Sequence, residues 1–166
     1  IAERPRFADR ADGFIAYSAK FWDWDDWVSE FDWKAKRRAN ITWPFHVGAD
    51  IVPTIMYEWG VIPEPPPKSE EPILHERLLE HARKHGLRMP IDLPNGGGLP
   101  KELFEKFPDC RTLTMQWSEY EPYQQLHPGD PLLKRLMVDF IRHYEERYGS
   151  DHIYLAEFAS ESRILE

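Results

Sequence analysis

Short apolar runs alternate with longer segments of helical periodicity along this chain. The apolar runs have the length of buried strands, and they cover residues 14–19, 41–47, 87–93 and 152–158. Between them, apolar residues recur every three or four positions, which is the spacing of a helix with one buried face. Strands that are separated by helices predict parallel β/α units, because a parallel return to the same sheet needs a crossover connection.

The first helix has a well-marked start. Asp23 is its predicted N-cap and Asp26 the matching capping-box residue. Trp24, Trp27 and Phe31 then fall on one face of the helix. We interpret these aromatic residues as core residues of a capped helix rather than as a ligand-binding box.

Further helices are predicted downstream, over residues 50–59, 69–86, 100–107 and 130–149. Ser69 and Asp130 are the expected caps of the two long ones. Gly86 and Gly149 are where these two helices should end, since glycine adopts the left-handed C-terminal conformation most easily. Residues 111–117 are predicted to form a short strand or an extended segment.

Two architectures accept this pattern: a doubly wound open sheet, complete at 166 residues, or part of an eight-stranded barrel of about 250 residues. We predict an α/β fold of parallel (β/α) units that forms about half of a TIM-type (β/α)8 barrel. A barrel cut at its fourth strand would leave two unpaired edges. Residues 1–166 are therefore expected to be a single segment of a barrel catalytic domain that continues beyond Glu166 in the natural protein.

Composition limits the partners of this chain. The net charge of -8 argues against a basic surface that tracks phosphates, so nucleic acid is not an expected partner. No apolar stretch approaches the roughly 20 residues that span a bilayer, so no membrane-spanning segment is expected. The lone Cys110 excludes an internal disulfide and a thiolate cage for zinc.

Side chains that follow the strands are the strongest candidates for function, because ligands bind at the carboxyl ends of strands in both architectures. Trp117 and Tyr120 are aromatic residues suited to stacking on sugar rings, and Glu157 and Glu161 follow the last predicted strand. A pair of carboxylates is what glycoside hydrolysis requires. The alternative is that both glutamates are ordinary surface acids.

Several other polar residues have positions or spacings that can occur in functional sites. His46 and Asp92 also lie near strand ends. His81 and His85 have the i, i+4 spacing of metal ligands but lack the Glu of the metalloprotease motif, so we interpret them as solvated helix residues and predict no metal site. The glycine-rich stretch 95–98 does not match a phosphate-binding loop, and we interpret it as a flexible turn.

Several segments resemble, in order, the motifs of one known family. Residues 21–27 and 30–35 are similar to its WDW-x-x-W and E-[I/L]-D-W-M-A stretches, and Trp117-Ser118-Glu119-Tyr120 to its W-x-x-F. Residues 126–132 resemble its L-x-P-x-D-P entry to a helix, and residues 148–154 are close to its F-G-T-D-H-I-Y. The family is glycoside hydrolase family 89, the α-N-acetylglucosaminidases.

The resemblance implies a retaining glycoside hydrolase with Glu161 as general acid/base and Glu157 on the family's neighbouring acidic position. The nucleophilic carboxylate is expected downstream, outside these 166 residues. Asp50 stands where the family has a substrate-contacting Glu, so Asp50, Trp117, Tyr120 and Glu157 are the implied substrate-binding residues.

The resemblance also implies a carbohydrate substrate, no cofactor, and contact with the remainder of the barrel or with other domains of the same protein. It implies a secreted, periplasmic or lysosomal location. The residues themselves do not indicate a compartment. The loop over residues 90–100 and the residues just before Glu161 differ from the family's pattern. The alternative function is therefore that of a noncatalytic carbohydrate-binding relative with the same barrel.

Overall fold

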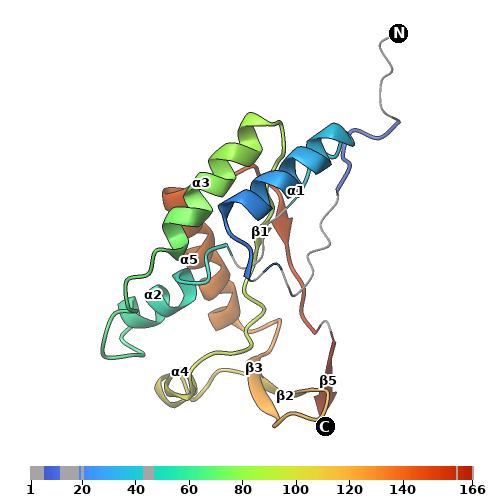
Figure 1. Cartoon of the computed structure of the whole chain (residues 1–166). Coiled ribbons are helices and arrows are strands. Elements are labelled where there is room, and N and C mark those ends of the chain that lie inside the picture. The colour runs from blue at the N-terminus through green and yellow to red at the C-terminus, as the bar shows by residue number, and fades with distance from the viewer. Residues whose placement is uncertain (1–5, 12–18, 20, 43–46, 160, 166) are drawn as a thin grey trace. The chain divides into compact units, whose positions relative to one another are not determined.

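The computed structural model describes residues 6–11, 19, 21–42, 47–159 and 161–165. The strand predicted at 14–19 lies almost wholly outside these residues, as does most of the strand predicted at 41–47, His46 included. The helices are α1 (Trp24–Lys36), α2 (Ile51–Glu58), α3 (Glu71–Lys84), α4 (Lys101–Lys106) and α5 (Pro131–Tyr148) (Figure 1). The strands are β1 (Ile91–Asp92), β2 (Thr112–Trp117), β3 (Tyr123–Leu126), β4 (Tyr154–Leu155) and β5 (Ser162–Leu165).

The chain divides into two compact units that interleave along the sequence. The first comprises residues 1–47, 69–91 and 148–153, and the second comprises residues 48–68, 92–147 and 154–166. The first unit contains α1 and α3, and the second contains α2, α4, most of α5 and the strands β2, β3 and β5. No described helix is both long enough and apolar enough to cross a membrane.

Parallel pairing runs from segment to segment in chain order. Ala11 pairs with Ile41 and Ile41 with Arg88 as isolated parallel bridges, and β1 pairs with β4. Within this last pairing the Ile91 N–H donates to the Ile153 carbonyl over 2.8 Å. The predicted parallel arrangement is thus confirmed for β1 and β4.

A doubly wound sheet, the alternative architecture, reverses its strand order at a switch point. The pairings among the described residues contain no such reversal.

A second sheet departs from the prediction, because it is antiparallel. Its strand order is β3-β2-β5, and Met115 of β2 pairs with Tyr123 on one side and with Ile164 on the other. The expectation of parallel β/α units throughout is therefore wrong for this part of the chain, and the strand predicted at 152–158 is reduced to β4. β3 and β5 escape prediction because four residues each are too few to establish a hydrophobic alternation.

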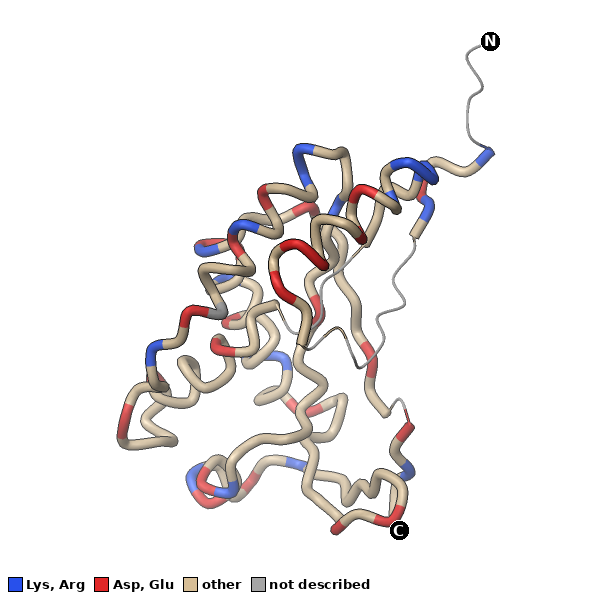
Figure 2. The backbone as a smooth tube through the Cα atoms, in the orientation of Figure 1, with Lys and Arg blue, Asp and Glu red and all other residues tan. Residues whose placement is uncertain are grey.

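The ends of the helices follow mostly from local chemistry. Asp23 accepts hydrogen bonds from the N–H groups of Asp25 and Asp26, which confirms the capping box of α1. Acidic residues gather at the start of α1 and basic ones at its end, as the helix dipole favours (Figure 2). The cap predicted for α3 is wrong: the helix begins after Glu70, without a side-chain cap, and Pro72 lies in its first turn, where the missing N–H costs no helical hydrogen bond.

Both long helices end at glycines in the left-handed region, as predicted: φ is +74° at Gly86 and +70° at Gly149. Asp130 accepts the Leu132 N–H over 2.8 Å at the start of α5, which confirms it as the cap. Buried apolar side chains then follow along one face of that helix, from Leu133 through Phe140 to Tyr148. The sequence pattern therefore placed both this helix and its buried face.

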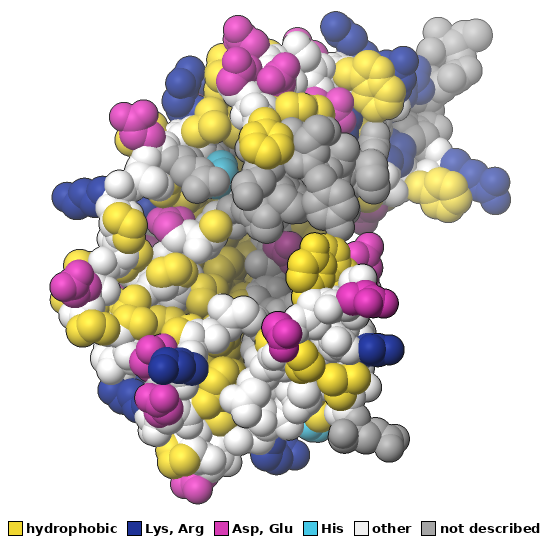
Figure 3. All heavy atoms as spheres, turned by 60° about the horizontal axis from the view of Figure 1, so that its bottom comes forward, with side chains coloured by type: hydrophobic (Ala, Val, Ile, Leu, Met, Phe, Trp, Pro, Cys, Tyr) yellow, Lys and Arg dark blue, Asp and Glu magenta, His cyan; other side chains and the backbone are white. Residues whose placement is uncertain are grey.

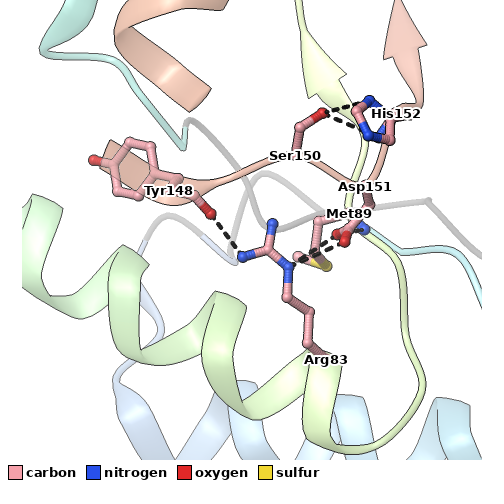
Figure 4. A network of polar contacts seen from close by, with 6 residues as sticks. All are labelled: Arg83, Met89, Tyr148, Ser150, Asp151 and His152. Carbon is pink, nitrogen blue, oxygen red and sulfur yellow. Dashed lines mark hydrogen bonds and ion pairs between the residues drawn. The ribbon is translucent and has the colours of Figure 1, made fainter. Parts of the chain in front are cut away.

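Asp151 connects three segments of the first unit (Figure 4). Both of its carboxylate oxygens accept from Arg83 Nε of α3 at 3.1 Å, and Oδ2 also accepts the Met89 N–H over 2.8 Å, just before β1. Arg83 Nη1 in turn donates to the Tyr148 carbonyl at the end of α5. Asp151 and Tyr148 belong to the segment 148–154, where the resemblance to family motifs is closest.

Replacing Asp151 with Asn should lower the free energy of unfolding by about 2–3 kcal/mol, since hydrogen bonds to a charged group contribute about 1.5–3 kcal/mol each. Urea denaturation of the intact protein measures this loss. Asp109→Asn, at an exposed position, is the matched control and should change stability by less than about 0.5 kcal/mol. Equal stability of the two variants would show that the Asp151 network contributes little.

Asp130 should make stability depend on acid pH. Burial by itself raises the pKa of this carboxyl, but the N–H groups of Arg111 and Leu132, with the charges of Arg111 and His127, lower the pKa below its ordinary value. Its stabilisation is therefore complete above the unfolded-state pKa of about 3.9 and is lost as the pH falls through the lower folded-state pKa. Asp130→Asn should flatten the fall of Tm below about pH 4, measured by thermal unfolding at stepped pH.

Asp109→Asn again serves as the control, because it removes one negative charge from an exposed site two residues before Arg111. If the Tm of the Asp130→Asn variant fell at acid pH as steeply as that of the unmodified protein, Asp130 would not be the source of this pH dependence.

Candidate functional site

Two of the predicted site residues meet at one edge of the antiparallel sheet. Trp117 ends β2, Glu161 directly precedes β5, and the register pairs Trp117 with Ser162. The indole N–H of Trp117 donates to Oε2 of Glu161 over 2.9 Å. Ser162 is fixed from the other side as well, with its Oγ 3.0 Å from the hydroxyl of Tyr123 on β3. Strand pairing thus holds the carboxylate at the end of β2.

Tyr120, a third predicted residue, joins this group through a tight turn. Its N–H donates to the Trp117 carbonyl over 3.1 Å, and its own carbonyl accepts from Gln116 Nε2 over 2.9 Å. Ser118 adopts a φ of +51° within the turn. The rings of Trp117 and Tyr120 consequently stack, with centroids 5.1 Å apart and planes 10° apart.

The stacked rings are open to solvent. Trp117 is 43% exposed and Tyr120 is 64% exposed. Apolar side chains are exposed at several places on the face that Figure 3 turns forward, with acidic and basic side chains among them. An exposed pair of parallel rings next to a carboxylate suits a ligand with an apolar face and polar edges, as a sugar ring has.

A buried glutamine supports the segment that leads to Glu161. Gln125 of β3 is fully buried, and its Nε2 donates to the Asn95 carbonyl over 3.0 Å and to the Phe158 carbonyl over 2.8 Å. Asn95 Oδ1 accepts the Gly97 N–H over 2.9 Å, and a Cβ at Gly97 would come within 3.1 Å of Gln125 Oε1. The stretch 95–98, interpreted above as a flexible turn, is therefore tied to the sheet through these contacts.

Asp50 lies in a different place. It precedes α2 without capping it, and its Oδ2 accepts from Arg147 Nη1 of α5 over 3.0 Å. A hollow of about 240 Å³ surrounds this ion pair, and its lining includes none of the three residues at the sheet edge. It is lined by Asp50, Ile51, Thr54, His143, Glu146 and Arg147.

Glu157 is exposed on the segment between β4 and β5. It follows Ala156 after the parallel pairing has ended, so the sheet does not fix its position as it fixes that of Glu161. Cys110 offers no competing nucleophile, because burial and the nearby Asp130 and Asp109 carboxylates raise the pKa of its thiol. Glu161 is thus the predicted acid with the most defined surroundings.

Sequence patterns missed two features of the site. Gln125 gave no signal, since a glutamine in a short polar strand looks like a surface residue. The sequence predicts a solvated His81, but its side chain is only 20% exposed and faces Asp32 of the neighbouring helix α1. The approach of Asp32 is a tertiary contact that helical spacing within α3 does not reveal.

Comparison with known proteins identifies relatives for most of the chain. The family described as the "Alpha-N-acetylglucosaminidase (NAGLU) tim-barrel domain" matches residues 53–165. Human alpha-N-acetylglucosaminidase is 24% identical over an alignment 180 positions long, which covers 88% of this chain. The chain spans 24% of the length of that relative.

Two solved structures share the fold. A family 89 glycoside hydrolase from Clostridium perfringens, in complex with 2-acetamido-1,2-dideoxynojirmycin, superposes with a TM-score of 0.64 at 17% identity and covers 95% of this chain. A form of that protein with two glutamates replaced by glutamine, in complex with its substrate GlcNAc-alpha-1,4-galactose, gives a TM-score of 0.63 at 18% identity over 90% of this chain. This chain covers 22% and 21% of those two chains.

Gln125→Leu should destabilise the protein by about 2–4 kcal/mol, because the partly buried Asn95 and Phe158 carbonyls would each lose a donor and Leu supplies none. Denaturant unfolding measures the effect. Gln124→Leu is the matched control, since Gln124 is the adjacent residue of β3 and is exposed. A similar loss in both variants would indicate that strand propensity, rather than the two hydrogen bonds, is responsible.

Proposed function

The chain belongs to the family of the alpha-N-acetylglucosaminidase TIM-barrel domain, and from this membership we propose that it is part of a retaining glycoside hydrolase in which Glu161 is the general acid/base. The observation that carries the proposal is the hydrogen bond from the Trp117 indole to Glu161, beside an exposed stack of two aromatic rings. It places a fixed carboxylate next to a surface suited to a sugar.

We propose that the parallel segments of this chain form about half of a (β/α)8 barrel, which other parts of the same protein complete. The pairing of parallel segments in chain order supports this, since barrel strands pair with their sequence neighbours. The superposition on family 89 structures, with a TM-score of 0.64, supports it as well. The nucleophilic carboxylate would come from the remainder of the barrel.

In the first step, protonated Glu161 gives its proton to the glycosidic oxygen while the bond from that oxygen to the anomeric carbon breaks. Trp117 holds Oε2, so Oε1 is the oxygen free to carry the proton. The second carboxylate attacks the anomeric carbon and forms a covalent glycosyl intermediate. The two carboxyl groups of a retaining pair lie about 5–5.5 Å apart, which defines where the partner must stand.

In the second step, Glu161 acts as a base. Its carboxylate takes a proton from a water molecule, and the resulting hydroxide oxygen attacks the anomeric carbon and releases the second carboxylate. The Trp117 N–H is available to Oε2 in both steps, because this contact does not use the oxygen that exchanges the proton. One side chain can therefore serve both as acid and as base.

The proposed substrate is a terminal α-linked N-acetylglucosamine, the sugar present in the complex of the Clostridium perfringens relative. The stacked rings of Trp117 and Tyr120 would receive the apolar face of a sugar ring. Glu157 would accept hydrogen bonds from hydroxyls of this sugar, whereas Asp50, which is paired with Arg147 in a separate hollow, is not assigned to the same sugar ring. No cofactor takes part in this scheme.

Glu161→Gln in the intact protein should lower kcat for substrates with poor leaving groups by roughly 10²–10⁴-fold, the usual contribution of general acid–base catalysis. The loss should be much smaller in the first step of an aryl glycoside whose leaving group needs no protonation. The ratio kcat/KM, which reports the first step, separates the two cases when it is measured on an N-acetylglucosaminyl disaccharide and on a nitrophenyl glycoside.

Glu121→Gln is the matched control, because Glu121 is an exposed glutamate in the turn that follows the aromatic pair. It should keep the kcat of the unmodified protein. Full activity of Glu161→Gln on the disaccharide would refute the assignment. Sugar binding by calorimetry without turnover of either substrate by the unmodified protein would identify a noncatalytic relative instead.

A further inference from the structure

Three potential metal ligands converge between α1 and α3, which lie side by side in the first unit (Figure 1). Asp32 belongs to α1, and His81 and His85 lie one turn apart at the end of α3. Asp32 Oδ1 is 3.7 Å from His81 Nε2 and 3.5 Å from His85 Nε2. All three ligand atoms lie within 4.8 Å of one another.

The orientation of His85 is that of a metal ligand. Its Nδ1 lies 2.9 Å from the His81 carbonyl oxygen, which only accepts hydrogen bonds, so Nδ1 carries a proton. In the neutral ring this leaves the lone pair on Nε2, the nitrogen that faces Asp32. A ligating histidine commonly donates its other ring N–H to a backbone carbonyl in this way.

The orientation of His81 is fixed by packing rather than by a hydrogen bond. Its ring meets the Trp24 ring edge-on at 5.5 Å and stacks on Phe31 at 6.4 Å. The ring of His85 lies 4.4 Å from it on the same helix. These neighbours hold Nε2 of His81 toward the carboxylate and leave its position well defined.

Two atoms of the cluster lack the partners that buried polar atoms normally have. Asp32 Oδ1 and His81 Nε2 are both inaccessible to solvent, and neither makes a hydrogen bond with any residue that the structure describes. A buried polar atom without a partner is costly, so such groups usually bind a ligand, water or ion. Here the two atoms face each other.

The distances agree with tetrahedral zinc coordination. Zinc bonds to histidine nitrogen and carboxylate oxygen are about 2.0–2.2 Å long, so two ligands at the tetrahedral angle lie about 3.3–3.6 Å apart. The separations of 3.5 Å and 3.7 Å between Asp32 Oδ1 and the two histidine nitrogens are close to this ligand–ligand distance, whereas they are long for hydrogen bonds. Two imidazoles and one carboxylate are a donor set that suits zinc and its neighbours better than Ca²⁺ or Mg²⁺.

We propose that Asp32, His81 and His85 bind one divalent transition-metal ion, zinc by preference, with water as the fourth ligand. The ion would join α1 to α3 and neutralise the buried carboxylate oxygen. Its role would be structural, because the cluster joins two helices through residues that the glycosidase scheme does not use. The proposal does not depend on that scheme.

The test measures metal binding by the intact protein after removal of metal with a chelator. Titration with Zn²⁺ by calorimetry, and with Co²⁺ by visible absorption, should reveal one site that requires the cluster. His85→Ala and Asp32→Asn should each weaken binding at that site by more than about 100-fold, beyond the 10–100-fold typical of changes outside the ligand set. Zn²⁺ should raise the Tm of the unmodified protein but not of His85→Ala.

His143→Ala is the matched control. His143 is also a helical histidine facing a single carboxylate, Glu58, at 3.0 Å, but it has no third ligand nearby among the described residues. It should bind zinc as the unmodified protein does. His85 is 39% exposed on the side chain, so its replacement leaves the folded core intact.

Zinc affinity that is the same in His85→Ala and in the unmodified protein would overturn the proposal. So would the absence of zinc binding by the unmodified protein, which would identify the cluster as an ion pair between Asp32 and protonated imidazole. Equal binding of Ca²⁺ and Zn²⁺ at the site would overturn the assignment to a transition metal.

Discussion

One carboxylate, that of Asp151, fixes how three distant segments of the first unit meet. It accepts hydrogen bonds from Arg83 on α3 and from the Met89 N–H before β1, while Arg83 also reaches the end of α5. Charge-assisted hydrogen bonds of this kind are among the strongest in proteins. The hydrogen bond from the Ile91 N–H to the Ile153 carbonyl follows two residues later on both segments, so the Asp151 contact lies directly before the pairing of β1 with β4.

The position of β4 matters because the chain continues from it to Glu161. Between β4 and Glu161, the side chain of Gln125 donates a hydrogen bond to the Phe158 carbonyl within the second unit. Directly after Glu161, β5 pairs with β2. Glu161 is therefore held before and after by backbone contacts and directly by Trp117. A general acid/base must remain within hydrogen-bond reach of the proton it transfers, and strand pairing would supply this constraint for Glu161 in its proposed role.

The proposed metal site and the proposed acid/base show two ways in which a carboxylate is accommodated. Glu161 is at the surface and keeps one oxygen for chemistry, with the other bound to an indole N–H. Asp32 directs a buried oxygen at two imidazoles, where only a cation or a proton removes the cost of burial. The first arrangement suits turnover, and the second suits a permanent link between helices.

The sequence by itself determined the helices, their faces and most of their ends, because capping, glycine conformation and apolar spacing act within a few residues of the chain. It also predicted Trp117, Tyr120 and Glu161, which carry local motifs. Tertiary structure decided the antiparallel sheet, the supporting role of Gln125 and the meeting of Asp32 with two histidines. These depend on strand register and on helix packing, which join residues tens of positions apart and leave no periodic trace in the sequence.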